Sequence, residues 1–172
     1  MKDKKKLMEG LKIFKKKKFK DYRGSISEIH LEKINKILKF CVLSKSRKNV
    51  LRAFHFQKKK PIHQLVACIE GSILDVVVDI RKNSKTFGKF QSFILSEKNN
   101  LSLYMSKGFA HGYLTLSNHS TIIYLNSQKY IKEKDSGFAW NDQFVNYNWK
   151  IKNPILSVKD KNLKSFKKVF GC

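Results

Sequence analysis

Short runs of alternating hydrophobic and polar residues recur along the chain and predict β-strands. The clearest strand is Ile-Leu-Asp-Val-Val-Val-Asp-Ile at residues 73–80. Other strands are predicted at residues 11–14, 25–29, 39–43, 49–57, 64–69, 90–95, 101–105 and 120–125. Glycine and asparagine turns separate them at spacings of roughly 8–12 residues, which is typical of an all-β sandwich or barrel. Strands do not alternate with helices, which argues against a parallel α/β sheet.

The other segments carry weaker patterns. Residues 31–39 have apolar side chains at helical spacing, and residues 163–170 are predicted to form a terminal helix. A turn is predicted at residues 19–24, a polar loop at 44–48 and an irregular aromatic segment at 127–148. Residues 1–7 are expected to form a basic tail and residues 8–172 a single domain.

The predicted strand at residues 49–57 mixes apolar side chains with polar ones. Alternate residues of a strand face opposite sides, so Arg52 and Phe54 are expected on one face and His55 and Gln57 on the other. A face that holds a histidine and an amide among small apolar groups suits the wall of a pocket. The alternative is a core histidine that bonds to one backbone carbonyl.

Composition indicates a folded protein, because 41% of the residues are hydrophobic and 12% are aromatic. No apolar run approaches the roughly 18 residues of a membrane helix, and no apolar leader follows the lysine-rich start, so neither membrane association nor secretion is expected. The three cysteines are scattered and form no CxxC pair, which favours a reducing cytoplasm.

The formal net charge of +24 has two explanations. It attracts an anionic partner such as a nucleotide diphosphate, or it reflects lysine-rich composition alone. The excess is mostly lysine spread over the whole chain, whereas a dedicated nucleic-acid binder concentrates charge and uses arginine. Nucleic acid is therefore not the expected partner.

The chain contains no P-loop, GxGxxG, HExxH or GxSxG motif, and it lacks the HxH pair expected of a metal cupin. Several longer motifs nevertheless occur in a fixed order. They are Phe-Lys-Asp-Tyr-Arg-Gly at 19–24 with Glu28, Val-Leu-Arg-Ala-Phe-His-Phe-Gln at 50–57, Gly-Phe-Ala-His-Gly-Tyr at 108–113, Gly-Phe-Ala-Trp-Asn-Asp at 137–142 and Leu-Ser-Val-Lys-Asp at 156–160. In these motifs the chain resembles the dTDP-4-dehydrorhamnose 3,5-epimerases, from about residue 11 to residue 160.

The resemblance implies an all-β RmlC-like cupin, a double-stranded β-helix or jelly-roll barrel with short peripheral helices. It also implies epimerisation at C3 and C5 of a nucleotide-linked 4-keto-6-deoxy sugar, with dTDP-4-dehydro-6-deoxyglucose converted to dTDP-4-dehydrorhamnose through a C4 enolate. No metal or organic cofactor is expected, because the ketone of the substrate accepts the electrons. The family further implies a homodimer whose N-terminal segments exchange between subunits.

The resemblance also assigns roles to residues. His55 is expected to be the base, Asp160 its carboxylate partner and Tyr124 the proton donor, which suits the near-neutral pKa of histidine. The residues expected to bind the substrate are Phe19, Arg23, Glu28, Arg52, Gln57, Gln64, His111, Tyr130, Asp135 and Lys159.

Six positions depart from the family pattern, and Ala53 for a glycine and Ser106 for a proline are interpreted as structural drift. Gln64 replaces a lysine that stabilises the enolate, Asp135 replaces a glutamate, and Phe40 and Val42 replace a glutamine and an asparagine. Losing a charged donor is expected to slow such a reaction by about 10²–10³. Two alternatives therefore stay open, which are an epimerase that inverts C3 or C5 alone and a catalytically inactive cupin that binds nucleotide sugar or nucleic acid.

Overall fold

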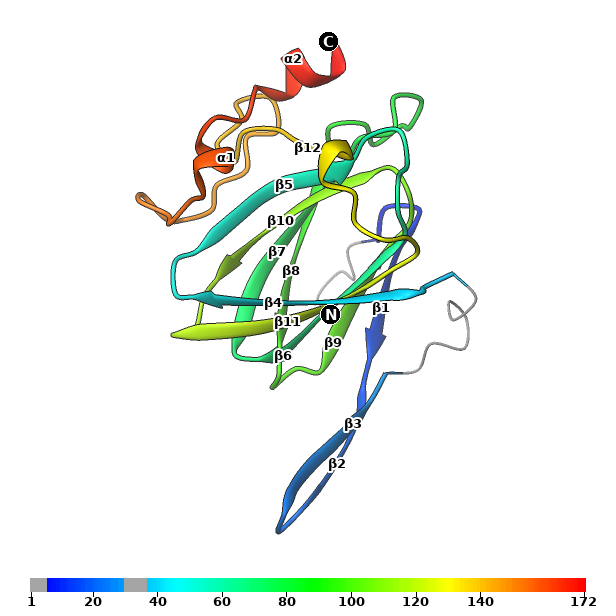
Figure 1. Ribbon diagram of the computed structural model, residues 1–172, viewed down its shortest axis with the longest axis vertical. Helices are drawn as coiled ribbons and strands as arrows, with labels where there is room; N and C mark the ends of the chain where they lie inside the picture. The colour runs from blue at the N-terminus through cyan, green and yellow to red at the C-terminus, as the bar shows by residue number, and fades with distance from the viewer. Residues whose placement is uncertain (1–5, 30–36) are drawn as a thin grey trace.

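The computed structural model describes residues 6–29 and 37–172, and it contains two facing five-stranded sheets and a separate hairpin (Figure 1). The first sheet contains, in order across it, β1 (Leu11–Lys15), β9 (Leu101–Met105), β6 (Gln64–Glu70), β11 (His119–Asn126) and β4 (Phe40–Arg47). The second contains β12 (Asp135–Gly137), β5 (Leu51–Gln57), β10 (Phe109–Thr115), β7 (Ser72–Asp79) and β8 (Phe90–Ser96). The hairpin pairs β2 (Lys17–Asp21) with β3 (Gly24–Glu28). The predicted all-β, cupin-like fold is confirmed.

Most predicted strands are present, but three assignments required correction. The predicted loop at 44–48 is largely the continuation of β4, because Ser44 and Ser46 face inward and hydrogen-bond the Tyr113 hydroxyl. The predicted turn at 19–24 is present but confined to residues 22–23, because residues 19–21 belong to β2 and Gly24 begins β3, and residues 109–115 form a strand that the alternation did not reveal.

The helical elements in the described part of the chain are short. They are the 3₁₀ turn Lys132–Lys134, α1 (Val158–Lys161) and α2 (Phe166–Phe170). The predicted helix at 31–39 lies mostly outside the described residues. None of the helices in residues 6–29 and 37–172 is long and apolar enough to cross a membrane.

Hydrophobic side chains pack on both sides of the second sheet. Its inner face meets the first sheet in a cluster that includes Val66, Leu103 and Ile122 from one sheet and Val77 and Leu95 from the other. Its outer face is covered by the C-terminal segment, drawn orange to red in Figure 1, which contributes Phe138, Val145, Trp149 and Phe166. The C-terminal segment is therefore anchored directly behind β5.

A β-bulge in β5 changes the expected facing of its side chains. His111 of β10 lies opposite His55, but Tyr113 lies opposite Arg52, so Ala53 and Phe54 together face one residue of β10. Phe54 joins the outer cluster while Arg52 and His55 both line the inner cavity. The sequence-based expectation that Arg52 and His55 face opposite sides was wrong for this reason.

Gly112 is the residue that faces the bulge. A Cβ atom at Gly112 would lie 2.8 Å from the Cα of Ala53 and 2.9 Å from the carbonyl oxygen of Arg52. Both contacts are with backbone, which cannot rotate away as a side chain can. The bulge therefore requires glycine at this position.

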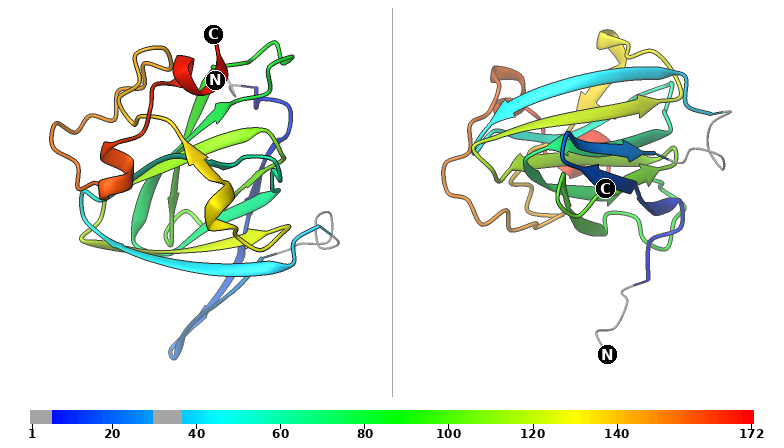
Figure 2. Two further views of the ribbon diagram at one scale, coloured as in Figure 1. Left: turned by 45° about the horizontal axis from the view of Figure 1, so that its top comes forward. Right: turned by 90° about the horizontal axis from the view of Figure 1, so that it is seen from below.

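The β2–β3 hairpin projects away from the barrel (Figure 1 and the left view of Figure 2). Three of its large hydrophobic side chains are exposed, with 55% of Phe19, 97% of Tyr22 and 71% of Ile26 accessible to solvent. Single exposed apolar residues are common on protein surfaces, but three on one short hairpin indicate a contact surface.

We expect Gly112→Ala to displace β5 and with it His55. Overpacking of this kind costs about 1–3 kcal/mol of folding free energy, and it should also disrupt the His55–Asp160 contact described below. Thermal melts and a titration of His55 followed by NMR would measure the two effects. Gly171→Ala is the control, because Gly171 has φ 71° and no atom near its missing Cβ, so it should lower stability alone. A normal His55 titration in Gly112→Ala would contradict this prediction.

Candidate active site

A cavity of about 340 Å³, here called the main cavity, opens between the two sheets. The second sheet contributes Arg52, His55, His111 and Tyr113, and the first sheet contributes Val42, Gln64, Tyr124 and Asn126. The rest of its lining comes from the segment after β11 and from around α1, and consists of Tyr130, Asp135, Ser157, Lys159 and Asp160. The structure thus brings together nine of the sequence-predicted site residues, which are Arg52, His55, Gln64, His111, Tyr124, Tyr130, Asp135, Lys159 and Asp160.

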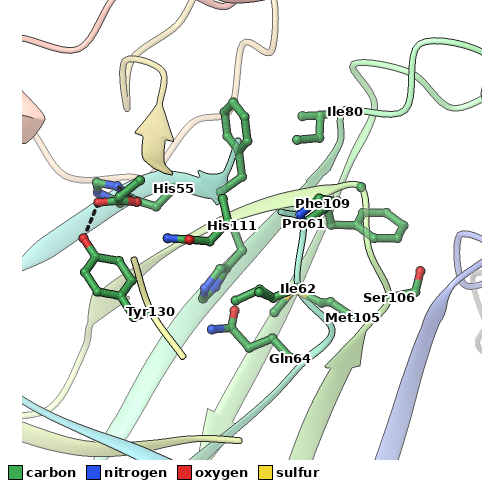
Figure 3. A pocket seen from close by; sticks show the side chains of 14 residues that line it. His55, Pro61, Ile62, Gln64, Ile80, Met105, Ser106, Phe109, His111 and Tyr130 are labelled. Carbon is green, nitrogen blue, oxygen red and sulfur yellow. Dashed lines mark hydrogen bonds and ion pairs between the residues drawn. The ribbon is translucent and has the colours of Figure 1, made fainter. Parts of the chain in front are cut away.

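A smaller cavity of about 120 Å³, here called the side cavity, adjoins the main cavity and shares His55, Gln64, His111, Tyr130 and Asp135 with it. Figure 3 shows His55, His111 and Tyr130 on one side of it and Met105 and Phe109 on the other. Its own lining is mostly apolar, so it extends the polar main cavity with a hydrophobic recess.

The closest contact in the main cavity joins His55 to Asp160, with 2.7 Å between Nε2 and Oδ1. Asp160 is only 4% exposed, and its other oxygen accepts a hydrogen bond from the Ser157 hydroxyl at 2.8 Å. Ser157 is also the N-cap of α1, where it accepts from the Asp160 backbone N–H. This reciprocal capping fixes the carboxylate in one orientation.

A backbone bridge brings Asp160 to His55, although the two residues are 105 positions apart. Leu51 at the start of β5 donates its N–H to the Ile155 carbonyl at 3.0 Å, and Ile155 donates to Asn49 at 2.8 Å. The chain then runs from Ile155 directly into Ser157 and α1. The strand that carries the histidine thus holds the segment that carries its partner.

A second carboxylate, Asp135, faces the other side of the His55 ring. Its Oδ1 lies 3.5 Å from Nδ1 of His55, which is an ion-pair distance, and Nδ1 makes no hydrogen bond with the described residues. The remaining oxygen of Asp135 accepts from the Tyr130 hydroxyl at 2.8 Å and from the Lys159 ammonium group. Asp135, Tyr130 and Lys159 thus form a polar cluster beside the imidazole.

The two carboxylates decide the protonation of His55. Burial lowers the pKa of its imidazole, but the nearby carboxylates of Asp135 and Asp160 outweigh burial and raise this pKa to about 9. Burial in turn raises the pKa of Asp135, but His55, Lys159 and Tyr130 together bring it down to about 2. Near neutral pH the site therefore holds an imidazolium between two carboxylates.

His111 and Tyr124 meet across the cavity, with ring centroids 5.9 Å apart and planes at 65°. Nδ1 of His111 lies 3.2 Å from the fully buried Asp75 carboxylate, which fixes the orientation of the ring. Burial raises the pKa of the Tyr124 hydroxyl well above its ordinary value, with Tyr113 and Asp75 adding to the effect. Tyr124 therefore keeps its proton at neutral pH and can donate it.

Arg52 contacts a group of hydroxyl side chains at one side of the main cavity. Its Nε donates to Ser46 Oγ at 3.3 Å, and Ser46 and Ser44 each lie 3.0 Å from the Tyr113 hydroxyl. The group positions the guanidinium of Arg52 on the same wall as His55. A forked cation in this place suits phosphate or carboxylate oxygens.

Gln57 lies in the side cavity instead of the main one. It is 6% exposed, and its amide donates to the carbonyl oxygen of Ile131 at 3.3 Å, which ties the end of β5 to the segment that carries Tyr130. Gln64 reaches both cavities and donates to Asn126 Oδ1 at 2.9 Å.

Phe19, Arg23 and Glu28 are not brought to the cavity of their own chain. All three lie on the β2–β3 hairpin, and Arg23 is paired with Asp21 of the same hairpin at 2.6 Å. Phe19 and Arg23 line a separate surface depression.

Three cavity residues escaped the sequence analysis, namely Tyr113, Asn126 and Ser157. For two of them, the alternation of strand residues gives a signal in the sequence. Tyr113 and Asn126 stand two positions from His111 and Tyr124 respectively, on the same strands, so they share the faces of those residues. Ser157 carried the signal of an N-cap, three residues before a carboxylate.

Within residues 6–29 and 37–172, histidine, cysteine and carboxylate side chains form no group of three or more that is arranged to hold a metal ion. Each cavity histidine instead faces carboxylates at hydrogen-bond or ion-pair distance. The chemistry available to the described residues is acid–base chemistry.

Comparisons with known proteins agree with this geometry. The family model for dTDP-4-dehydrorhamnose 3,5-epimerase matches residues 5–168. The dTDP-4-dehydrorhamnose 3,5-epimerase of Shigella flexneri is 39% identical over 163 residues, which is 90% of each chain. A crystal structure of the Elizabethkingia anophelis enzyme of the same name superposes with a TM-score of 0.85 at 36% identity, over 95% of each chain. The dTDP-6-deoxy-D-glucose-3,5-epimerase of Legionella pneumophila, solved with dTDP-4-keto-L-rhamnose, gives 0.87 at 30% identity over 93% of this chain and 89% of that one.

The fold and the paired acid–base groups define a cupin isomerase. The chain belongs to the dTDP-4-dehydrorhamnose 3,5-epimerase family.

The raised pKa of His55 predicts how stability depends on pH. Because the folded-state pKa of about 9 exceeds the ordinary 6.5, protonated His55 stabilises the fold fully below pH 6.5, and this contribution is lost as pH rises through 9. The loss is on the order of 3 kcal/mol, since one pKa unit is about 1.4 kcal/mol. Denaturant unfolding of the wild type and of His55→Gln from pH 6 to 10 measures this contribution. It is the difference between the free energies of unfolding of the two proteins at each pH.

The variant Asp135→Asn tests the cause of the raised pKa of His55. Removing one of the two carboxylates should lower the pKa of His55 below about 9, as measured by NMR titration of its ring. The exposed His119 lies outside both cavities, so the NMR signals of its ring serve as the reference. An unchanged His55 pKa would show that Asp135 does not act on the imidazole.

Proposed function

We propose that this protein epimerises C3 and C5 of a dTDP-linked 4-keto-6-deoxy sugar and converts dTDP-4-dehydro-6-deoxyglucose to dTDP-4-dehydrorhamnose. Family membership supports this reaction, and the Legionella relative at 30% identity was solved with dTDP-4-keto-L-rhamnose. The deciding observation on this chain is that His55, bonded to Asp160, and Tyr124 stand on opposite sheets across one cavity.

Inversion of a carbon centre needs a base on one face of the sugar and an acid on the other. A sugar ring between the two sheets would have the imidazole of His55 on one face and the phenol of Tyr124 on the other. His55 takes the proton from carbon, and the electron pair of the broken C–H bond moves through the new C=C bond onto the C4 oxygen. Tyr124 then delivers its proton to the opposite face, and the ketone re-forms.

The protonation states of the site bear on this sequence. The imidazole of His55 accepts a proton only after it has lost its own, and its pKa of about 9 makes it a strong base once neutral. The charge that it gains is stabilised by Asp160, which is held by Ser157. Substrate that separates Asp135 from His55 would lower the pKa of the imidazole toward the working pH.

The cations around the main cavity suit the diphosphate of a nucleotide sugar. Arg52 lies on one wall, and Lys159 projects from α1. The overall charge of +24 adds long-range attraction for an anionic substrate. We therefore assign Arg52 and Lys159 to diphosphate binding, and His111, Gln64, Tyr130 and Asp135 to the sugar.

We further propose a homodimer in which the β2–β3 hairpin reaches the cavity of the partner subunit. Phe19, Arg23 and Glu28 are remote from the cavity of their own chain, and the hairpin exposes apolar side chains. On the outer face of β4, Leu43 is also apolar, and 61% of it is accessible. The free state of the three cysteines is consistent with a cytoplasmic protein.

Two variants test the reaction. His55→Ala and Tyr124→Phe should each slow hydrogen–deuterium exchange at the sugar by at least about 10², because each removes one proton-transfer group. The measurement is proton NMR of dTDP-4-keto-6-deoxyglucose in D₂O, which resolves C3 from C5. His119→Ala, an exposed histidine outside both cavities, is the control and should exchange like the wild type.

The exchange pattern also separates the alternatives. Deuterium at one centre alone would establish a single-site epimerase, and no exchange with any nucleotide-linked 4-keto sugar would leave a binding protein. Wild-type exchange rates in His55→Ala would refute the assignment of the base.

The dimer is tested by mass and by hairpin variants. Light scattering should give twice the chain mass of 20.1 kDa. Arg23→Ala should raise KM while the fold stays intact, because Arg23 would contact substrate only from the partner subunit. A monomer with full activity would contradict the proposed dimer.

A further inference from the structure

Two carboxamides face each other across neighbouring strands in the main cavity. Gln64 at the start of β6 and Asn126 at the end of β11 are register partners. Nε2 of Gln64 donates to Oδ1 of Asn126 at 2.9 Å. Both side chains line the main cavity, and Asn126 is only 4% exposed. We refer to these two residues as the amide pair.

The amide pair retains a hydrogen-bond donor for a ligand. With its oxygen bound to Gln64, Asn126 keeps its own NH₂ group without a partner among the described residues. Exchanging the roles of the two amides would leave the NH₂ group of Gln64 in the same situation. In either arrangement the pair presents one donor, and a polar donor with so little exposure calls for an acceptor.

The proposed reaction supplies such an acceptor. Proton removal at C3 gives a C3=C4 enolate, and removal at C5 gives a C4=C5 enolate. Both place the negative charge on the C4 oxygen. A donor that meets this oxygen lowers the barrier for both centres.

The other donors in the main cavity have other partners or other proposed roles. Lys159 and Tyr130 both donate to Asp135, and His111 is fixed through Nδ1 by Asp75. Tyr124 has to give its proton to carbon. Arg52 donates to Ser46 and lies on the same wall as the base, whereas the amide pair lies on the opposite wall beside Tyr124.

We propose that Asn126, oriented by Gln64, donates its amide hydrogen bond to the C4 oxygen of the substrate and stabilises the enolate. Asn126 is then a catalytic residue and Gln64 a positioning residue. This inference rests on the proposed function. No bond forms to the amide, because the proton goes to His55 and the electron pair goes to the C4 oxygen.

The pair also accounts for Gln64 where the resembled family has a lysine. A single amide is a weaker donor than an ammonium group, but its orientation is fixed by its partner and it does not titrate. The electrostatic contribution at the C4 oxygen is therefore independent of pH, unlike the contribution of a lysine.

Asn126→Asp is the sharpest variant. The aspartate has the same shape and still accepts from Gln64, but it places an acceptor with a negative charge where the wild type has a donor. Exchange in D₂O should fall by about 10²–10³ or more, with the loss in kcat rather than KM. Asn126→Ala should slow exchange by about 10². Gln143→Ala, which removes an exposed amide outside both cavities, should exchange at the wild-type rate.

The ratio of the two centres separates this role from a structural one. Because both enolates share the C4 oxygen, exchange at C3 and at C5 should fall by the same factor in each Asn126 variant. A displaced base or acid would instead change the two rates unequally. If the wild type exchanges at one centre alone, the same fold-loss is expected there.

Gln64 variants test the orientation. Gln64→Glu can only accept, so it turns the Asn126 amide away from the cavity and should slow exchange at least tenfold. Gln64→Lys should exchange at least as fast as the wild type. The new ammonium group should also add an ionisation at alkaline pH that the wild type lacks. Melting curves verify that each variant is folded.

The outcomes distinguish the two proposals. Wild-type exchange with equal rates in Asn126→Asp would overturn the role of the amide pair and leave the proposed function standing. Absence of exchange in the wild type with every nucleotide-linked 4-keto sugar tried would overturn both.

Discussion

The contact between the β5 bulge and Gly112 determines which side chains reach the interior of the barrel. Regular alternation would place Arg52 and His55 on opposite faces of β5. The extra residue at Ala53–Phe54 turns both into the main cavity and still buries Phe54 in the outer cluster. One strand thereby places a guanidinium and an imidazole in the same cavity, while its other face anchors the C-terminal segment that carries Asp160.

Carboxylates are scarce in this basic chain, and they are concentrated where the histidines lie. The chain has 13 acidic residues against 37 basic ones. Asp75, Asp135 and Asp160 surround the two cavity histidines, and two of these carboxylates are almost fully buried. Burying a charge is costly unless it is paired, so this arrangement has a function that surface lysines do not share. The lysines make the whole surface basic, whereas the local carboxylates determine the protonation of His55.

The barrel and most of the site could be predicted from the sequence, because strand alternation and ordered motifs are local properties. Alternation failed at β5, where a bulge depends on contact with Gly112 of another strand. It failed again at β4, because Ser44 and Ser46 are typical loop residues. Their place in a strand depends on hydrogen bonds to Tyr113, which lies on a strand of the other sheet. Alternation places Asn126 on the face of Tyr124, but its bond to Gln64 depends on the register of two strands and cannot be predicted from either segment alone.

The carboxylate that orients the base stands on a helix of one turn. α1 spans Val158–Lys161, and it is held by the Ser157 cap, the bond to His55 and the nearby backbone bridge at Ile155. Helices this short have little stability of their own, so local opening of this turn needs far less free energy than unfolding the barrel. We therefore expect warming to release Asp160 while both sheets stay paired, with a reversible loss of activity below the temperature at which the protein melts. Substrate bound against α1 should keep this helix folded. The ligand would then stabilise the element that unfolds at the lowest temperature.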